Sequence, residues 1–520
     1  MTSSDPTRPG GAEPPFPPGD YPLVVVGSGP GAIQVSYALS RLGIDHAVIS
    51  RDETPGGMFR RFPVFQRLLS WTKPYAPVDR GSRAYERYDW NSLLADEPEH
   101  RSLQPGFMDG SSEFPARSEM EVNLATFAER TGVRVRYGTT WESTRREDGP
   151  EGNRFVLETT AGEYRTPILV VAVGVAEPWS PATPGIELAR HYADTQPAET
   201  YAGRRIFLIG KQVSAFELAT GLLPWACGIV LVSPSPTQLS VVTRSLVGVR
   251  ARYVQPYEDF VLGGGVSVLD AAIDSIERVS GGDALVVRVR PSTPAGAEQA
   301  AELAIEADVV ISATGWTAPL RDLPSLGVAT FGHSRLPAQT PWWESATVPG
   351  IYFAGTIGQG AQGLRKHGIP SNSGAVHGAR YNARVLAREI ARRHFGRAPD
   401  RRPIETASVA RFLGDEISGA PELFHQRSYL CRVVELDPSS GPHDAGVVPL
   451  TAFLDEGGPD AVAVTLEADG SAAIYPVVYV RRGGRTTEHD LDPDPLLDFR
   501  APGYATALGG IVRELHPGLN

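Results

Sequence analysis

The stretch Leu23-Val24-Val25-Val26-Gly27-Ser28-Gly29-Pro30-Gly31-Ala32 decides the fold of this chain. An apolar run ends in a glycine-rich turn, and the helix-like segment 33–42 follows directly. Strand, tight turn and helix in this order let the backbone approach a pyrophosphate closely, and they direct the free N–H groups of a helix N-terminus at the anion. The pattern GxGxxA within this stretch therefore predicts a dinucleotide-binding unit.

A second unit of the same kind lies deep in the chain. The apolar run 206–209 leads into Gly210-Lys211-Gln212-Val213-Ser214-Ala215, and a helical pattern continues to residue 225. The next strand pattern, 229–232, leads to Ser233 and offers no acidic residue for a free ribose 2′-hydroxyl, and Arg244 follows it. This favours NADPH over NADH as the second nucleotide. Two nucleotide sites imply two nucleotides.

The order of the patterns predicts an α/β protein in which one Rossmann-like domain is inserted in another. The apolar runs 168–174 and 308–315 both end in glycine and echo one another on either side of the second unit. We expect a disordered tail over 1–20, a first nucleotide-binding domain over 21–178 and 308–395, and a second over 179–307. The segment 404–520 has strand-like runs at 461–466 and 473–480, which predict a C-terminal α+β domain of unknown role.

Composition narrows the classes of partner. The formal net charge of the 520-residue chain is -11 and no long basic run occurs, which argues against nucleic acid or an anionic membrane and favours a small molecule. The chain has only two cysteines, Cys227 and Cys431, so neither a disulfide framework nor a metal site is predicted. The first 20 residues lack the features of a signal peptide, and we expect a cytoplasmic protein.

The order of these motifs resembles that of flavoproteins with two dinucleotide-binding domains, which include thioredoxin-reductase-like enzymes and class B flavin-containing monooxygenases. The resemblance covers about 21–394 and implies FAD at the first glycine turn and NADPH at the second. It implies FAD contacts from Gly27, Gly29, Pro30, Ala32, Ser50, Arg51, Gly56, Gly57, Phe59, Trp141, Gly174, Gly315, Gly355 and Thr356. It implies NADPH contacts from Gly210, Lys211, Gln212, Ser214, Ala215 and Ser233, with Glu217 completing the pattern GxGxSAxE.

Two departures from the family pattern affect the predicted sites. Ser50 follows the second strand, where an acidic residue usually binds the adenosine ribose, and a serine binds ribose more weakly. Gln212 replaces the middle glycine of the second turn and crowds the approach to the pyrophosphate, while we expect the charge of Lys211 to compensate. A strand over 133–137 is expected ahead of the adenine-contacting segment at Trp141.

Two segments are expected to form the wall of the active site. The loop 58–73 follows Gly57, and the resemblance implies that it passes over the isoalloxazine ring with Trp71 and Lys73 near the substrate. The stretch 359–381 leads into the helix pattern 375–394, whose N-terminus is expected to face the flavin pyrimidine edge. Arg365, Lys366 and His367 are then candidates for contact with substrate or nicotinamide. The alternatives are an ordinary aromatic loop and a solvated loop.

The absence of a cysteine pair guides the functional prediction, because disulfide reduction needs such a pair beside the flavin. Electrons from reduced nicotinamide then pass to another acceptor, and the resemblance implies dioxygen. The sequence predicts an NADPH-driven FAD monooxygenase that oxygenates a small amine or inserts oxygen next to a carbonyl. A flavin oxidoreductase without oxygen insertion and a non-catalytic flavin-binding sensor remain alternatives. Three roles stay open for the C-terminal domain: it covers the active site, forms a homodimer or recognises a carrier.

Overall fold

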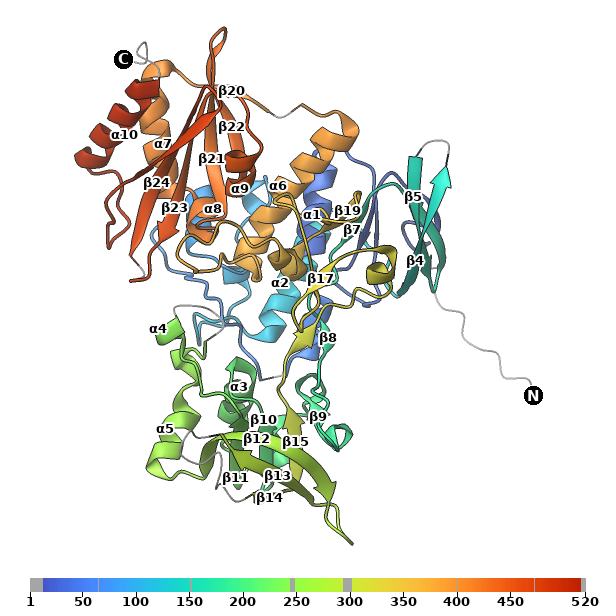
Figure 1. Cartoon of the computed structure of the whole chain (residues 1–520). Helices are drawn as coiled ribbons and strands as arrows, with labels where there is room; N and C mark the ends of the chain where they lie inside the picture. The colour runs from blue at the N-terminus through green and yellow to red at the C-terminus, as the bar shows by residue number, and fades with distance from the viewer. Residues whose placement is uncertain are drawn as a thin grey trace.

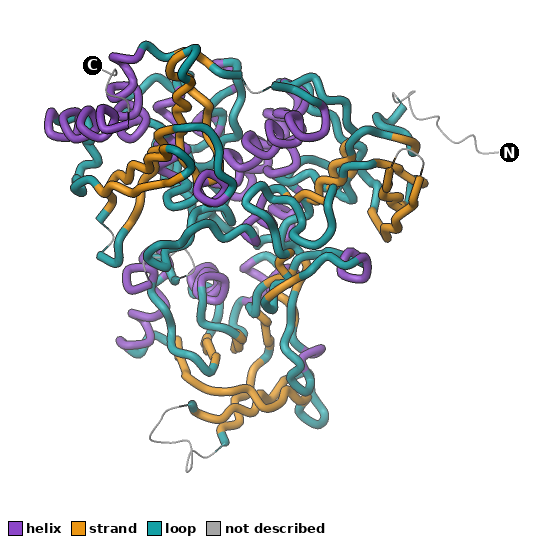
Figure 2. The backbone as a smooth tube through the Cα atoms, turned by 45° about the horizontal axis from the view of Figure 1, so that its top comes forward, coloured by secondary structure: helices purple, strands orange, loops and turns teal. Residues whose placement is uncertain are grey.

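A computed structural model describes residues 13–63, 65–149, 152–243, 248–292, 302–398, 400–471 and 473–515. Figure 1 shows three parts: the first nucleotide-binding domain in the middle and at the right, the second at the bottom, and the C-terminal domain at the upper left. The tube in Figure 2 shows strands grouped separately in each of these parts. The predicted α/β class with two Rossmann-like domains is confirmed.

The first domain is built on a parallel sheet of four short strands in the order β19-β7-β2-β3. The strands are β2 (Val24–Val26), β3 (Ala47–Ile49), β7 (Leu169–Val171) and β19 (Ile351–Phe353), and every residue in them is buried. Val25 packs on the side of helices α1 (Pro30–Arg41) and α6 (Val376–Phe395), whereas Val24 and Val26 pack toward an antiparallel sheet on the other face. Burial on both faces explains the continuous apolar runs in the sequence. Helix α2 (Arg117–Arg130) adds a further cluster.

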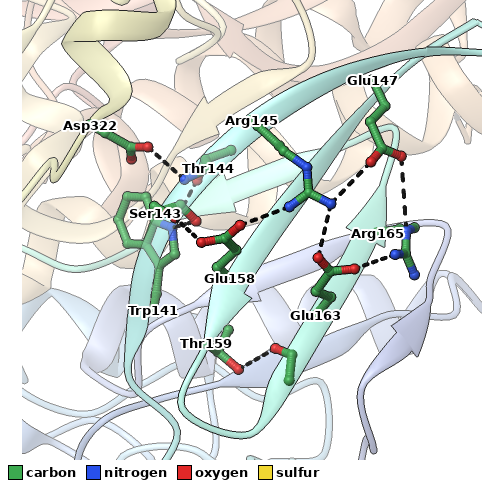
Figure 3. Close-up of polar contacts among 11 residues, drawn as sticks. Trp141, Ser143, Thr144, Arg145, Glu147, Glu158, Thr159, Glu163, Arg165 and Asp322 are labelled. Atoms are coloured by element: carbon green, nitrogen blue, oxygen red, sulfur yellow. Dashed lines mark hydrogen bonds and ion pairs between the residues drawn. The ribbon is translucent and has the colours of Figure 1, made fainter.

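The antiparallel sheet consists of β4 (Trp141–Gly149), β5 (Gly152–Thr159) and β6 (Gly162–Thr166). Arg145 on β4 forms ion pairs with Glu147, Glu158 and Glu163, and the Thr144 N–H donates to Asp322, as Figure 3 shows. The strand β1 (Gly19–Asp20) pairs with β6 in parallel. The prediction of a disordered tail through residue 20 is therefore wrong for its last residues, which a strand partner holds; residues 1–12 lie outside the described part.

The second domain has a seven-stranded sheet in the order β14-β13-β12-β11-β10-β15-β9. Its strands are β9 (Arg190–His191), β10 (Arg205–Ile209), β11 (Gly228–Ser233), β12 (Val266–Arg278), β13 (Leu285–Pro291), β14 (Leu303–Ala307) and β15 (Val309–Ser312). Its helices are α3 (Val213–Leu222), α4 (Ser240–Thr243) and α5 (Gln255–Leu262). Because β15 pairs with β10, the predicted return to the first domain at residue 308 is wrong.

The two chain crossings between the nucleotide-binding domains pair with one another. β8 (Glu177–Pro178) and β16 (Trp316–Thr317) form a two-stranded antiparallel ribbon. The return to the first domain therefore occurs at this ribbon, after Gly315. A further small ribbon of β17 (Thr330–Phe331) and β18 (Leu336–Pro337) follows within the first domain.

The C-terminal domain is a six-stranded sheet in the order β20-β22-β21-β23-β24-β25. The strands are β20 (Arg402–Pro403), β21 (Leu430–Asp437), β22 (Gly441–Pro449), β23 (Ala461–Ala468), β24 (Ile474–Arg482) and β25 (Arg485–Asp490), and the helices are α7 (Val409–Gly419), α8 (Pro421–His425), α9 (Leu450–Asp455) and α10 (Pro502–Leu515). Arg83 of the first domain joins it through Glu416, at 2.7 Å, and Glu422, at 2.8 Å. None of the described helices is long and apolar enough to cross a membrane.

Candidate functional site

A cavity of about 980 Å³ lies at the carboxyl ends of β2, β3 and β7, where α/β sheets bind their ligands. Most of its lining comes from the first domain. Ser240 and Arg250 of the second domain and Arg427 of the C-terminal domain complete the wall. Since all three parts of the protein contribute, the C-terminal domain takes part in enclosing this cavity, which was one of the three roles left open by the sequence.

The three glycines of the first turn have different surroundings. A Cβ on Gly27 would lie 2.4 Å from the carbonyl oxygen of Ala172, and one on Gly31 would lie 2.3 Å from Gly355 Cα. A Cβ on Gly29 would meet nothing within 4 Å, and Gly29 lines the cavity. Gly27 and Gly31 thus let backbone segments pack together, while Gly29 leaves open space at the N-terminus of α1. This space fits a pyrophosphate, because the first N–H groups of a helix have no intrahelical acceptor.

Asp52 supplies the acidic group that the sequence analysis did not find. Its carboxylate accepts hydrogen bonds from the hydroxyls of Ser28, at 2.9 Å, and Ser50, at 3.2 Å, and all three residues line the cavity. Ser50 therefore does not replace the acidic residue but helps to hold it. The signal was present in the sequence, since Asp52 stands only three residues after the end of β3. Asp52 is therefore the candidate for the acidic residue that binds the ribose.

Gly56 and Gly57 are not among the residues that line the cavity, and both contact residues that do. The Gly56 N–H donates to the Ser28 carbonyl at 2.8 Å, which ties this segment to the glycine turn. A Cβ on Gly57 would lie 1.9 Å from an oxygen of Asp52, so a larger residue here would displace that carboxylate from its present position. Phe59 lines the cavity as expected. Direct contact of these two glycines with FAD stays a prediction.

The other predicted FAD contacts divide in the same way. Pro30, Arg51, Trp141, Gly174, Gly355 and Thr356 line the cavity. Ala32 is fully buried in the core, and Gly315 lies at the link to the second domain, where its carbonyl accepts from Trp179 N–H at 3.1 Å. Trp141 donates its indole N–H to Thr144 at 2.8 Å within β4 (Figure 3). The strand predicted over 133–137 is reduced to one bridge between Arg136 and Ile49.

The second glycine turn repeats the geometry of the first at its entrance. A Cβ on Gly210 would lie 2.7 Å from the carbonyl oxygen of Ala313, the counterpart of the contact between Gly27 and Ala172. None of the six predicted NADPH contacts, Gly210, Lys211, Gln212, Ser214, Ala215 and Ser233, lines the cavity. Ala215 is buried beneath the turn, while Ser214 is half-buried, and Ser233 ends β11. Arg244 lies outside the described residues.

Lys211 and Gln212 differ from their predicted roles. Lys211 is 1% exposed, and its ammonium forms an ion pair with Asp270 on β12. Its charge is therefore neutralised inside the second domain and does not compensate at a pyrophosphate. Gln212 is exposed and stands at the N-cap of α3, where its side chain makes no capping hydrogen bond.

Glu217 has a structural environment. It is buried on α3 and accepts a hydrogen bond from the Tyr192 hydroxyl. Burial raises the pKa of Glu217 to about 8. This residue of the GxGxSAxE pattern therefore ties α3 to the segment that enters the second domain, and it does not line the cavity.

Two pairs of predicted catalytic residues lie away from the cavity. Lys73 Nζ lies 4.4 Å from the centre of the Trp71 ring, and neither side chain lines the cavity. Lys366 forms ion pairs with Glu488 and Asp490 of β25, and His367 bonds to the Tyr475 hydroxyl of β24 at 2.7 Å. These acidic and phenolic partners on the C-terminal sheet hold Lys366 and His367 at the interface between domains. Of the five candidates, only Arg365 lines the cavity.

Trp90 and His377 occupy the cavity wall that was predicted for Trp71. Trp90 stacks on Trp71 with ring centroids 4.3 Å apart, and its other neighbour, His377, is also at 4.3 Å. His377 is fully buried at the start of α6, and neither ring nitrogen has a hydrogen-bond partner among the described residues. Burial, together with nearby arginines, lowers the pKa of His377 well below its ordinary value, so the ring is neutral. No local sequence pattern pointed to this pair, because tertiary packing joins segments far apart in the chain.

The comparisons with known proteins agree with this architecture. Residues 24–355 match the family described as pyridine nucleotide-disulphide oxidoreductase. FAD-dependent oxidoreductase domain-containing protein 2 from Mus musculus is 27% identical over 397 residues, which cover 72% of this chain. Its counterpart from Danio rerio is 26% identical and covers 71%. Both matches span 58% of the relatives' own length.

Solved structures share the fold at low sequence identity. Bacillithiol disulfide reductase Bdr (YpdA) from Bacillus cereus has a TM-score of 0.54, at 20% identity, over 72% of this chain and 100% of its own. A flavin-containing monooxygenase from Stenotrophomonas maltophilia has a TM-score of 0.51, at 17% identity, over 72% and 98%. The family match covers more than half of the chain, and the two-domain flavoprotein fold agrees with it. The chain belongs to the pyridine nucleotide-disulphide oxidoreductase family.

Proposed function

We propose that this protein is an FAD-dependent, NADPH-driven monooxygenase that acts on a small molecule. The family supports an oxidoreductase, and the names of the mouse and zebrafish relatives support FAD. The observation that carries the proposal is a cavity that fits FAD but has no cysteine among its described lining residues. Without a thiol at the flavin, electrons from NADPH need an acceptor other than a protein disulfide.

The positions of both cysteines support this reasoning. Cys431 is fully buried in β21 of the C-terminal domain, and burial raises the pKa of its thiol far above the ordinary value. Cys227 is exposed and stands just before β11 of the second domain. Both thiols are free, and neither lines the cavity. The disulfide chemistry in the family name is therefore not proposed for this chain.

The residues around the cavity have defined tasks in this proposal. The N-terminus of α1 at Gly29 holds the pyrophosphate of FAD, and Asp52 accepts hydrogen bonds from its adenosine ribose. The N-terminus of α6, at Val376, supplies positive potential along the cavity wall. When bound, FAD supplies hydride acceptance from NADPH and the transfer of electrons to dioxygen.

The chain also controls water and protons at the inner wall. Trp90, Phe59 and Phe62 give this wall an apolar surface, and their side chains limit the access of water to the reacting atoms. Neutral His377 carries a proton on one ring nitrogen and a lone pair on the other, so it can donate one hydrogen bond and accept another. Both nitrogens are buried, and the described residues offer them no hydrogen-bond partner.

The preference for NADPH rests on the end of β11. Ser233 stands there, and its hydroxyl donates to the Ser235 carbonyl at 3.2 Å. An acidic side chain at this place would favour the free ribose hydroxyls of NADH, and a serine leaves room for a 2′-phosphate. We therefore expect NADPH to reduce the flavin faster than NADH, and we expect Ser233→Asp to reverse or narrow this preference.

The test is anaerobic reduction by NADPH followed by mixing with dioxygen, with and without small amines and ketones. A monooxygenase transfers an atom of labelled dioxygen to product, and consumption of NADPH matches product formation. If the flavin is reduced but all electrons appear as hydrogen peroxide with every compound tried, a flavin oxidoreductase without oxygen insertion is the better description. If NADPH and NADH both fail to reduce bound FAD, the sensor alternative holds. Gly29→Val is the control without bound FAD.

A further inference from the structure

The cavity wall includes a loop, 362–373, whose two sides have different neighbours. Gln362, Arg365 and the run 369–373 of this loop line the cavity. Residues between them contact the C-terminal domain instead, namely Gly363, Leu364, Lys366 and His367. The loop therefore joins the cavity on one side to the C-terminal domain on the other.

Lys366 is held by β25, the edge strand of the C-terminal sheet. Its ammonium forms ion pairs with Glu488 and, at 3.2 Å, with Asp490. These two carboxylates stand two residues apart on one strand and therefore on the same face of the sheet. The side chains of Lys366, Glu488 and Asp490 are 26%, 39% and 53% exposed, so dissolved salt weakens this contact.

The neighbours of Lys366 in the loop are held as well. His367 Nε2 and the Tyr475 hydroxyl of β24 form a hydrogen bond of 2.7 Å. A Cβ on Gly363 would lie 2.5 Å from a carbon of the Tyr429 ring, so the backbone here packs directly against that ring. Contacts with the C-terminal domain therefore stand on both sides of Arg365.

The far end of the loop is fixed by buried polar side chains. Asn372 Nδ2 donates to the His425 carbonyl at 2.9 Å, and Gln426 Nε2 donates to the Ser373 hydroxyl at 3.0 Å. Gln426 and Ser373 are 0% and 2% exposed. Because buried hydrogen bonds are costly to break, this end stays in place. The freedom of the part that carries Arg365 then depends on the contacts of Lys366 and His367.

Arg365 has an unfavourable backbone conformation at the cavity. Its φ is +51°, in the left-handed region that residues with a side chain rarely adopt. Such a conformation persists only where the surrounding structure imposes it. The residues that follow, Lys366 and His367, are bound to the C-terminal sheet, while the Arg365 guanidinium donates to Gln362 Oε1 at 2.8 Å on the cavity side. The C-terminal sheet thus holds Arg365 in a conformation that a free loop disfavours.

We propose that the C-terminal domain shapes the cavity by holding the loop 362–373, and that Lys366 and His367 are positioning residues that act through Arg365. Of the described residues of the C-terminal domain, Arg427 alone lines the cavity, so most of the influence of this domain is indirect. The loop and its partners all follow residue 355, where the family match ends. This inference goes beyond the proposed function, because it concerns the cavity wall and not the reaction.

The first test measures hydrogen exchange of the full-length protein by mass spectrometry, with and without FAD. Tyr475→Phe removes the hydroxyl that is bonded to His367, and Lys366→Met removes the ion pairs. Each should lower the protection of the amides in 362–368 by about fivefold or more, with a smaller effect on 369–373. Lys366→Arg should keep most of the protection. KCl at about 1 M should lower the wild-type protection toward that of Lys366→Met and change that variant little.

The second test determines the effect of the loop on the cavity through the rate at which FAD leaves the loaded protein, followed by fluorescence after dilution. Tyr475→Phe should raise this rate by about threefold or more, because a loosened wall opens more often. Arg365→Ala should raise it by a similar factor. In the double variant Tyr475→Phe should add little, because the positioning contact acts through Arg365.

Asp492→Asn is the matched control, because it removes a negative charge from an exposed residue just beyond β25. It should change neither the protection of the loop nor the release of FAD. The proposal is overturned if Tyr475→Phe and Lys366→Met leave the loop as protected as in the wild type, or if Asp492→Asn has the same effect as either. It is also overturned if protection falls while FAD leaves at the wild-type rate. Exchange without FAD requires no reaction, so failure here is distinguishable from failure of the proposed function, which anaerobic reduction by NADPH tests.

Discussion

Gly29→Val and Gly31→Ala form a matched pair, because the two glycines stand two residues apart in one turn and face opposite surroundings. A Cβ at position 31 would lie 2.3 Å from Gly355 Cα, whereas carbon atoms in contact are about 3.5–4 Å apart, so this contact must open by more than about 1 Å. Overpacking of this kind costs about 1–3 kcal/mol. Gly31→Ala should therefore lower the stability of the protein without FAD.

Gly29→Val should have the opposite profile. A Cβ at Gly29 meets no atom within 4 Å, and its φ of -73° is open to any residue, so the protein without FAD should keep its stability. The valine side chain then occupies the space proposed for the pyrophosphate, and FAD affinity should fall at least tenfold, which is about 1.4 kcal/mol. Thermal unfolding by circular dichroism and FAD titration by fluorescence separate the two effects. The reasoning is refuted if Gly29→Val binds FAD like the wild type, or if Gly31→Ala unfolds at the wild-type temperature.

Three further predictions concern groups outside the cavity. Glu217 binds its proton more tightly in the folded protein, because burial raises its pKa from 4.5 to about 8. The stabilisation of the folded protein by this proton is complete below about pH 4.5 and is lost as the pH rises toward 8. The loss is up to about 1.4 kcal/mol of unfolding free energy per pH unit. Glu217→Gln should reduce this loss in thermal unfolding between about pH 5 and about pH 8, and identical pH profiles would contradict the assignment. Asp270→Asn should destabilise the second domain by about 1–3 kcal/mol in denaturant unfolding, because it leaves the buried Lys211 ammonium without its partly exposed partner, and adding Lys211→Met should recover part of the loss. Cys227→Ser combined with Cys431→Ala should keep NADPH-driven flavin reduction within about twofold in stopped-flow absorbance, and a larger loss in a folded variant would indicate thiol chemistry.

The sequence predicts those features of the fold that depend on local backbone geometry, such as the glycine turns. The turn at Gly27 to Ala32 needs glycine because its backbone approaches other backbone segments, at Ala172 and Gly355, and such a requirement is visible in residue identity alone. The same holds for Gly210 against Ala313. The predicted domain boundary at residue 308 was wrong because the apolar run of β15 is typical of a central strand in either domain. Only the pairing of β15 with β10 decides which sheet it joins.

The site was less accessible, because charge and contact depend on partners that are distant in the chain. The position of Lys211 in a glycine turn predicts a phosphate ligand. In the structure, Asp270, 59 residues later, forms an ion pair with its ammonium and neutralises that charge inside the domain. The sequence predicts Lys366 as a free cation near the cavity, but in the structure it forms ion pairs with Glu488 and Asp490 on β25. Conversely, only the folded structure shows that His377 is buried without a hydrogen-bond partner for its ring nitrogens among the described residues.

The sequence by itself determined the two glycine turns, the order of strands and helices, and the lack of a cysteine pair, since each of these depends on residue type and near neighbours. Only the tertiary structure decided which side chains line the cavity. His377, Arg250 and Arg427 come from three different parts of the molecule. The physical reason is that burial and unpaired charge are properties of the packed chain, and they cannot be assigned to a residue before its surroundings are known.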